Sequence, residues 1–98
     1  MKNGHDKVPV SVRVMGKRWV IEYREQDEYG LCDYKQTKIT ISEDQSLENM
    51  RDTVLHELVH AISNEVKAGL NEKQTATIST GVLAILRDNP GLVRFLTD

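Results

Sequence analysis

The fold is decided by residues 46–69, which read SLENMRDTVLHELVHAISNEVKAG. Apolar residues recur here at spacings of three and four, the period of an amphipathic helix. This apolar stripe consists of Leu47, Met50, Val54, Leu58, Ile62 and Val66. Ser46 is a suitable N-cap, Glu48 lies near the positive end of the helix dipole, and Gly69 can form a left-handed C-terminal cap. The stretch predicts one long helix with a buried face.

A second helix is expected directly after the first. Asn71 and Gln74 have the spacing of a capping box, and the helical pattern stops before Asn89-Pro90-Gly91. The apolar residues expected to face inward are Ile78, Val82, Ile85 and Leu86. A strip of small residues that would let two helices approach closely consists of Thr77, Thr80, Gly81 and Ala84. Residues 92–96 are expected to form one apolar turn folded back on the body.

Strands are expected before the first helix, where apolar and β-branched residues follow a period of two. The predicted strands are residues 8–14, 19–23 and 38–41. Pro9 favours an edge position, Gly16-Lys17 a hairpin turn, and residues 25–30 a polar loop. The predicted fold class is α+β: a three-stranded antiparallel sheet packed on two helices, in a single domain of residues 1–98.

The composition excludes several classes of protein. The chain has 98 residues, 39% of them hydrophobic and 29% charged, which is typical of a globular domain. A net charge of −2 without a basic cluster argues against nucleic acid or an anionic membrane as a partner. Cys32 is the single cysteine, and residues 1–6 lack the apolar region of a signal peptide. We therefore expect a cytoplasmic protein.

The residues that carry chemistry are His56-Glu57-Leu58-Val59-His60, a His-Glu-x-x-His pattern. Residues four apart lie about 40° apart around a helix and about 6 Å apart along it, so two imidazoles can converge on one ion. Imidazole is a good zinc ligand, and Glu57 can act as general base on a water at the metal without being a ligand itself.

Two alternatives are that the histidines are ordinary core residues or part of a solvated face. The helical wheel argues against a core role, because both histidines lie roughly opposite the apolar stripe. Their neighbours on that face are polar: Asn49, Thr53 and Asn64. A chance match to the motif on the one long amphipathic helix is improbable in a chain with three histidines.

A third protein ligand is needed, because catalytic zinc usually has three protein ligands. Glu72 is the predicted third ligand, since the short link of residues 68–70 lets it fold back to the ion; the alternative is a carboxylate that only faces the helix dipole. Glu65 is excluded, because it lies on the apolar side of the first helix. Weaker candidates are Gln74, Cys32 and His5.

The chain resembles the zincin-like metallopeptidases, especially the minimal members found in bacterial and phage genomes. The resemblance covers about residues 30–90 in three blocks: 30–41, 53–62 and 70–90. It implies a zinc-dependent peptidase acting on peptides or proteins, with strand 38–41 bordering the cleft and Glu72 in the place of the third ligand of thermolysin-like enzymes. Only eleven residues separate His60 from Glu72, fewer than in those enzymes, and the third histidine of metzincins is absent.

Two matters stay open from the sequence. Tyr34 and Arg87 are candidates for stabilising a negatively charged oxygen during catalysis.

The alternative to a peptidase is a metal-stabilised binding or regulatory module without activity in isolation, because the chain lacks a second lobe and a partner protein could complete the cleft. A metal-free structural protein is a third hypothesis, which requires the motif to be a coincidence.

Overall fold

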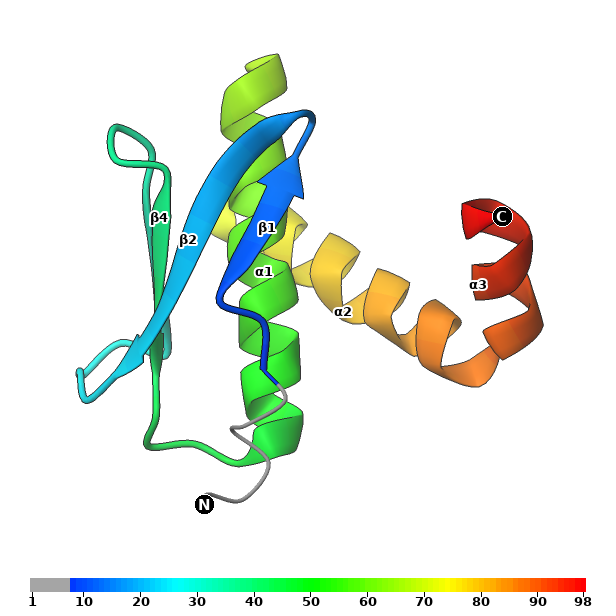
Figure 1. Cartoon of the computed structure of the whole chain (residues 1–98), viewed down its shortest axis with the longest axis horizontal. Helices are drawn as coiled ribbons and strands as arrows, with labels where there is room; N and C mark the ends of the chain where they lie inside the picture. Colours follow the sequence, from blue (N-terminus) through cyan, green and yellow to red (C-terminus); the bar gives the residue numbers. More distant parts are fainter. Residues whose placement is uncertain (1–7) are drawn as a thin grey trace.

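The computed structural model describes residues 8–98 and has an α+β architecture of four strands and three helices in that range. The strands are β1 (Ser11–Val14), β2 (Lys17–Arg24), β3 (Gly30–Asp33) and β4 (Lys38–Ser42). The helices are α1 (Leu47–Val66), α2 (Glu72–Asp88) and α3 (Pro90–Thr97). The sheet covers one side of α1, whereas α2 leaves from another side and carries α3 away from the sheet (Figure 1). His5 lies outside the described residues.

The sheet is mixed and has the order β1-β2-β4-β3. β1 pairs with β2 and β3 pairs with β4 in antiparallel register, but β2 and β4 are parallel. The prediction of three antiparallel strands was therefore wrong. The cause is β3, which the sequence did not reveal: with this extra strand the chain reverses twice between β2 and β4, so β4 returns in the direction of β2.

The hairpin between β1 and β2 turns at Met15 and Gly16, one residue earlier than predicted. Both residues have positive φ, 51° and 86°. A two-residue turn with this geometry matches the twist of the flanking strands. Lys17 is therefore the first residue of β2 and pairs with Val14.

The core lies between the sheet and α1. Its fully buried members are Trp19, Ile21, Ile39, Ile41, Met50 and Ala61, with Val54 and Leu58 packed against them. The predicted apolar stripe of α1 is thus confirmed over most of its length. Ile62 and Val66 are exceptions, at 43% and 51% exposed. The C-terminal end of α1 projects beyond the strands (Figure 1).

The second predicted helix exists, but its buried face was predicted wrongly. Thr75 and Ser79 are its buried residues. Of the predicted strip of small residues, Thr80 contacts α1, where its hydroxyl donates a hydrogen bond of 3.2 Å to Asp52. The apolar residues Ile78, Val82 and Ile85, predicted to face inward, are exposed. The reason is that α2 packs mainly on α1 and, at its C-terminal end, on α3, and among the described residues neither contact covers its apolar flank.

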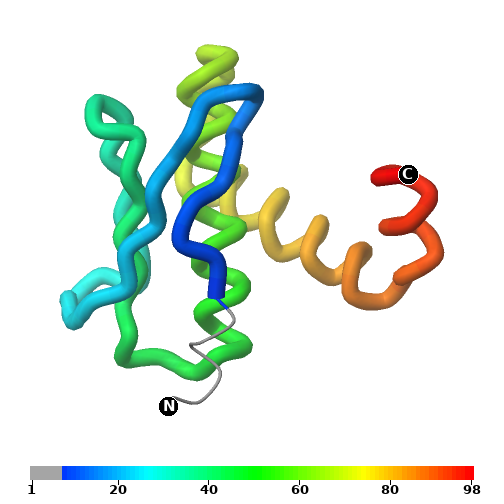
Figure 2. Tube along the Cα trace, viewed as in Figure 1, coloured from blue at the N-terminus to red at the C-terminus, as the bar shows by residue number. Residues whose placement is uncertain are grey.

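The C-terminal apolar segment, predicted as one turn folded back on the body, forms the helix α3. It packs against α2 and has no buried residue. Phe95 is 80% exposed, and the C-terminus lies at the far end of the arm formed by α2 and α3 (Figure 2). Across residues 8–98, none of the helices combines the length and the apolar character that crossing a bilayer requires.

Candidate metal centre

Helix α1 carries the first three residues of the site. As predicted, the helix begins at Ser46, whose side chain accepts a hydrogen bond from the backbone N–H of Asn49. His56 and His60 lie one turn apart, with ring centroids 4.8 Å apart and an interplanar angle of 72°. Their side chains are 21% and 14% exposed. The two imidazoles therefore point into the same partly enclosed volume, as the spacing predicts.

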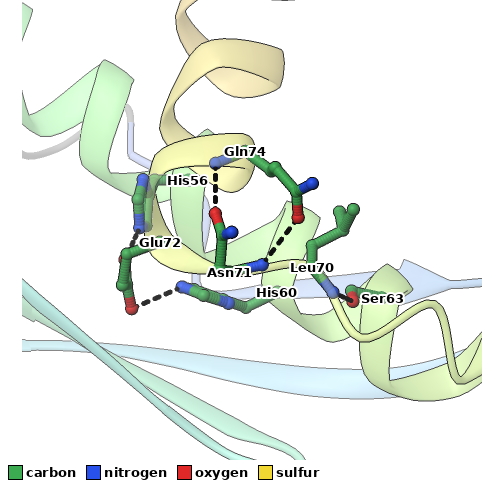
Figure 3. Close-up of polar contacts among 7 residues, drawn as sticks. All are labelled: His56, His60, Ser63, Leu70, Asn71, Glu72 and Gln74. Atoms are coloured by element: carbon green, nitrogen blue, oxygen red, sulfur yellow. Dashed lines mark hydrogen bonds and ion pairs between the residues drawn. The ribbon is translucent and has the colours of Figure 1, made fainter.

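A tight link brings the chain from α1 back to the histidines. Lys67 ends α1 in the left-handed region at φ 57°, a role that the sequence assigned to Gly69. Gly69 also has positive φ, 68°, so the chain turns at both positions. The hydroxyl of Ser63 accepts a hydrogen bond of 3.1 Å from the Leu70 backbone N–H, which fixes the link to α1 (Figure 3).

The capping box of α2 then places Glu72 as the first residue of the helix. The Asn71 side chain accepts from the Gln74 backbone N–H at 2.8 Å, and the Gln74 side chain accepts from the Asn71 backbone N–H at 3.0 Å (Figure 3). This predicted box is confirmed. The Gln74 side-chain oxygen is engaged in this box, which makes Gln74 a weaker ligand candidate than Glu72.

The Glu72 carboxylate lies between the two imidazoles. Its Oε1 is 3.0 Å from His56 Nε2, and its Oε2 is 3.1 Å from His60 Nε2 (Figure 3). All three side chains offer a ligand atom within 4.8 Å of the others. Tetrahedral zinc with bonds of about 2.0–2.1 Å needs ligand atoms about 3.3 Å apart. This donor set fits zinc, because small movements suffice to place one ion among the three side chains.

The charge state of Glu72 also suits a ligand. Desolvation acts to raise the pKa of this carboxyl, but the hydrogen bond with His56 and the contacts with His60 outweigh it, so the pKa is lowered. The side chain is 78% exposed, so these contacts are screened by solvent. Glu72 is thus ionised near neutral pH and able to bind a cation.

Glu57 is buried, with 6% of its surface exposed, beside an open cleft of about 530 Å³. The cleft lies between α1 and β3, and its lining includes His56, Glu57, His60 and Glu72. Burial raises the pKa of Glu57 from its ordinary value of 4.5 to about 7; the charge of His60 lowers the pKa and that of Glu72 raises it. A carboxyl with a pKa near neutrality can both accept and return a proton at pH 7.

This raised pKa predicts how the stability of the metal-free protein depends on pH. Between about pH 4.5 and 7 the folded protein keeps a proton on Glu57 that the unfolded chain has released. The stability contributed by this group is therefore present below pH 4.5 and is lost as the pH rises through 7. Glu57→Gln, which cannot ionise, should melt close to wild type at pH 5 but roughly 5 °C or more above it at pH 8.

The measurement is thermal unfolding of chelator-treated protein at the two pH values. The groups that face this carboxyl or act on its charge are present in both proteins: His60, Glu72, Cys32 and Tyr34. A comparison of the two proteins at one pH therefore isolates the effect of residue 57 on the melting temperature. An equal difference in melting temperature at both pH values would contradict the prediction.

Of the other residues considered from the sequence as ligands or catalytic groups, some line the cleft and others lie outside it. Cys32 and Tyr34 line the cleft, but the Cys32 sulfur is not among the converging ligand atoms. Burial raises the pKa of the Cys32 thiol to about 12, and the nearby charge of Glu57 adds to this. Arg87 contacts Glu48 at 3.9 Å and does not line this cleft. Glu65, excluded from the sequence, contacts Lys17 at 3.1 Å.

Tyr34 is a better candidate than Arg87 for the group that stabilises a negatively charged oxygen during catalysis. Its ring packs edge-to-face on Trp19, with centroids 6.4 Å apart. Burial raises the pKa of its phenol, and Cys32 and Glu57 act in the same direction. The hydroxyl is therefore protonated near neutral pH and can donate a hydrogen bond into the cleft.

The strand that borders the cleft is β3, whereas the resemblance indicated residues 38–41. These residues form β4, which lies between β2 and β3 and is paired on both sides. β3 is at the edge of the sheet, and three of its residues line the cleft: Gly30, Leu31 and Cys32. This strand could not be predicted, since a four-residue segment that begins with glycine and ends with aspartate has low strand propensity.

Comparisons of the chain with protein-family models, with curated proteins and with solved structures found no significant match.

Proposed function

We propose that the protein is a zinc-dependent peptidase in which His56, His60 and Glu72 hold the metal and Glu57 is the general base. The observation that carries this proposal is the convergence of two imidazoles and a carboxylate at 3.0–3.1 Å, at an open cleft with a buried glutamate beside it. Two histidines and a glutamate are an established ligand set for catalytic zinc. The proposed activity is also the one that the resemblance to zincin-like metallopeptidases implies.

The ligand number favours catalysis over a purely structural metal. Structural zinc sites are usually closed by four protein ligands, whereas catalytic sites leave one position open. Three ligands converge among the described residues, and the most exposed of them, Glu72, lies at the rim. The fold also has its own core of buried apolar residues between the sheet and α1, which does not include the three ligands.

Zinc bound at this site supplies Lewis acidity, which brings the pKa of water close to neutral. Glu57 takes one proton from the attacking water as the new carbon–oxygen bond forms at the peptide carbonyl. The same carboxyl then delivers this proton to the amide nitrogen as the carbon–nitrogen bond breaks. The burial of Glu57 beside the cleft places this carboxyl where both transfers can take place. Tyr34 can donate to the carbonyl oxygen as negative charge develops there.

The substrate class follows from the edge strand. β3 offers the outer backbone groups of an edge strand beside the cleft, and an extended peptide can pair with such an edge by strand addition. A peptide bound in this way would pass in front of Glu57 and the ligands. We therefore propose an extended or unfolded segment of a protein as the substrate.

The direct test is hydrolysis of unfolded casein before and after metal removal. The zinc-loaded protein should cleave casein, chelator treatment should abolish the cleavage, and one equivalent of zinc should restore it. At a zinc concentration of 100 times the dissociation constant, the free energy of unfolding should rise by about 2.7 kcal/mol. Cleavage that persists without metal would refute the proposal.

A second candidate is a metal-stabilised binding module, favoured by the arm of α2 and α3. Phe95 and Leu96 on α3 are 80% and 63% exposed, more than an isolated stable domain usually leaves uncovered in one short helix. The same zinc titration separates the candidates. A large gain in stability without cleavage of casein would favour the module.

A further inference from the structure

Gly30, the first residue of β3, lies so close to α1 that no side chain fits. A Cβ atom placed there would be 2.7 Å from Thr53 Cγ2 and 2.9 Å from both Cγ and Oε2 of Glu57. Carbon atoms in proteins normally approach to about 3.5–4.0 Å. Gly30 is not among the glycines with positive φ, so this position needs glycine for space and not for its backbone conformation.

The strand cannot retreat from this contact without losing hydrogen bonds. The Tyr29 carbonyl, directly before Gly30, accepts a hydrogen bond of 2.8 Å from the Ser42 backbone N–H and a second of 3.2 Å from Gln45 Nε2. Gly30 itself is opposite Ile41, which is completely buried in β4. The start of β3 is thus held at a fixed distance from α1.

The helix side of the contact is held by the same Gln45. Its Oε1 accepts from Thr53 Oγ1 at 3.1 Å and from Asn49 Nδ2 at 2.6 Å. The Gln45 amide therefore links the Tyr29 carbonyl on one side to two side chains of α1 on the other. Thr53 is buried, and turning its methyl group away from Gly30 would break its bond to Gln45.

We propose that Gly30 is a positioning residue for Glu57, with Gln45 as the clamp that maintains the spacing between β3 and α1. Because the strand and the helix are both held, the space left by the missing side chain at Gly30 sets where the Glu57 carboxylate lies. An added methyl group must displace Glu57 or Thr53. The consequence for catalysis rests on the proposed role of Glu57 as general base, whereas the spatial relation does not.

The first test is Gly30→Ala, with Gly81→Ala as the matched control. A Cβ at Gly81 in α2 meets nothing within 4 Å, so that variant should keep the casein hydrolysis of wild type and melt about 4–8 °C above it, because alanine is favoured over glycine inside a helix. Gly30→Ala should lower the melting temperature of the zinc-loaded protein by about 5–10 °C. It should lower kcat at least about tenfold with KM nearly unchanged and one zinc still bound, because the displaced group is the base and not a ligand.

Two further variants distinguish positioning from general damage. Thr53→Ser removes the methyl group nearest to Gly30 but keeps the hydroxyl, so adding it to Gly30→Ala should restore part of the lost kcat. Gln45→Ala adds no atom and removes the clamp; it should fold, retain zinc and lower kcat by about threefold or more. Wild-type kcat in Gly30→Ala, or in a folded Gln45→Ala if the first variant fails to fold, would overturn the proposal.

A double-mutant cycle in thermal unfolding tests the spatial relation without any activity. In a Glu57→Ala background the two contacts of a methyl group at position 30 with Glu57 are gone and only the contact with Thr53 remains, so Gly30→Ala should lower the melting temperature by less than it does in wild type. An equal loss in both backgrounds would overturn the positioning role. A wild-type protein that leaves casein intact would refute the peptidase, while this cycle would still decide the role of Gly30.

Discussion

Glu57→Gln should abolish peptide hydrolysis while zinc remains bound. Glutamine has nearly the same shape as glutamate, so it fits the space beside Gly30, but it cannot accept a proton from water. General base catalysis typically contributes about 10²- to 10⁴-fold, and kcat with casein should fall by a factor in that range. Zinc content should stay at one equivalent, because the three ligands are unchanged.

The matched control for this variant is Glu65→Gln, the same substitution two turns further along α1. Glu65 contacts Lys17 on the surface and lies outside the cleft, so its loss should leave kcat at the wild-type value. Full activity in Glu57→Gln, or loss of its metal, would show that Glu57 is not the general base.

His60→Ala should greatly lower the affinity for zinc. It removes one of the three proposed ligands, the imidazole that contacts Glu72 Oε2. Loss of a group that merely supports a ligand typically costs about 10- to 100-fold in affinity, so loss of a ligand should cost more than about 100-fold. His56→Ala should behave in the same way, since its imidazole contacts the other carboxylate oxygen.

Zinc affinity can be measured by competition with a chromophoric chelator. Asn64→Ala is the control, because Asn64 lies one turn after His60 on the same helix and is exposed. It should bind zinc as wild type does. Unchanged affinity in both histidine variants would mean that the metal is held elsewhere.

The local parts of the site could be predicted from the sequence because they depend on residues close together in the chain. The histidine pair needs only the helical repeat, and the capping box of Asn71 and Gln74 needs a spacing of three. Glu72 could be predicted as a candidate because the link to α2 is short. Its contact with both imidazoles depends on the left-handed residues Lys67 and Gly69, of which only the glycine gave a signal.

The parts that could not be predicted depend on pairing between distant residues. β3 is short and weakly patterned, and it becomes a strand because its backbone pairs with β4. Because β3 was not predicted, the direction of β4 relative to β2 was predicted wrongly. The strand that borders the cleft was predicted wrongly for the same reason. Gln45 reads as a surface residue before a helix, although its amide connects Tyr29 to Thr53.

The prediction of the buried face of α2 was wrong for a different reason. Apolar residues at helical spacing predict burial only if another element covers them. Among the described residues, the small side chains Thr75 and Ser79 make the contact with α1, and nothing covers Ile78, Val82 and Ile85 fully. The hydrophobic pattern therefore identified a helix correctly but not the side on which it packs.

The most direct test of the metal centre is X-ray absorption at the zinc edge on protein loaded with one equivalent of zinc. We expect two imidazole nitrogens and carboxylate or water oxygens at about 2.0–2.2 Å, with an imidazole contribution that falls by half in His60→Ala. A sulfur atom at about 2.3 Å would place Cys32 in the ligand set instead. A spectrum without imidazole would contradict the central claim that His56 and His60 bind the metal.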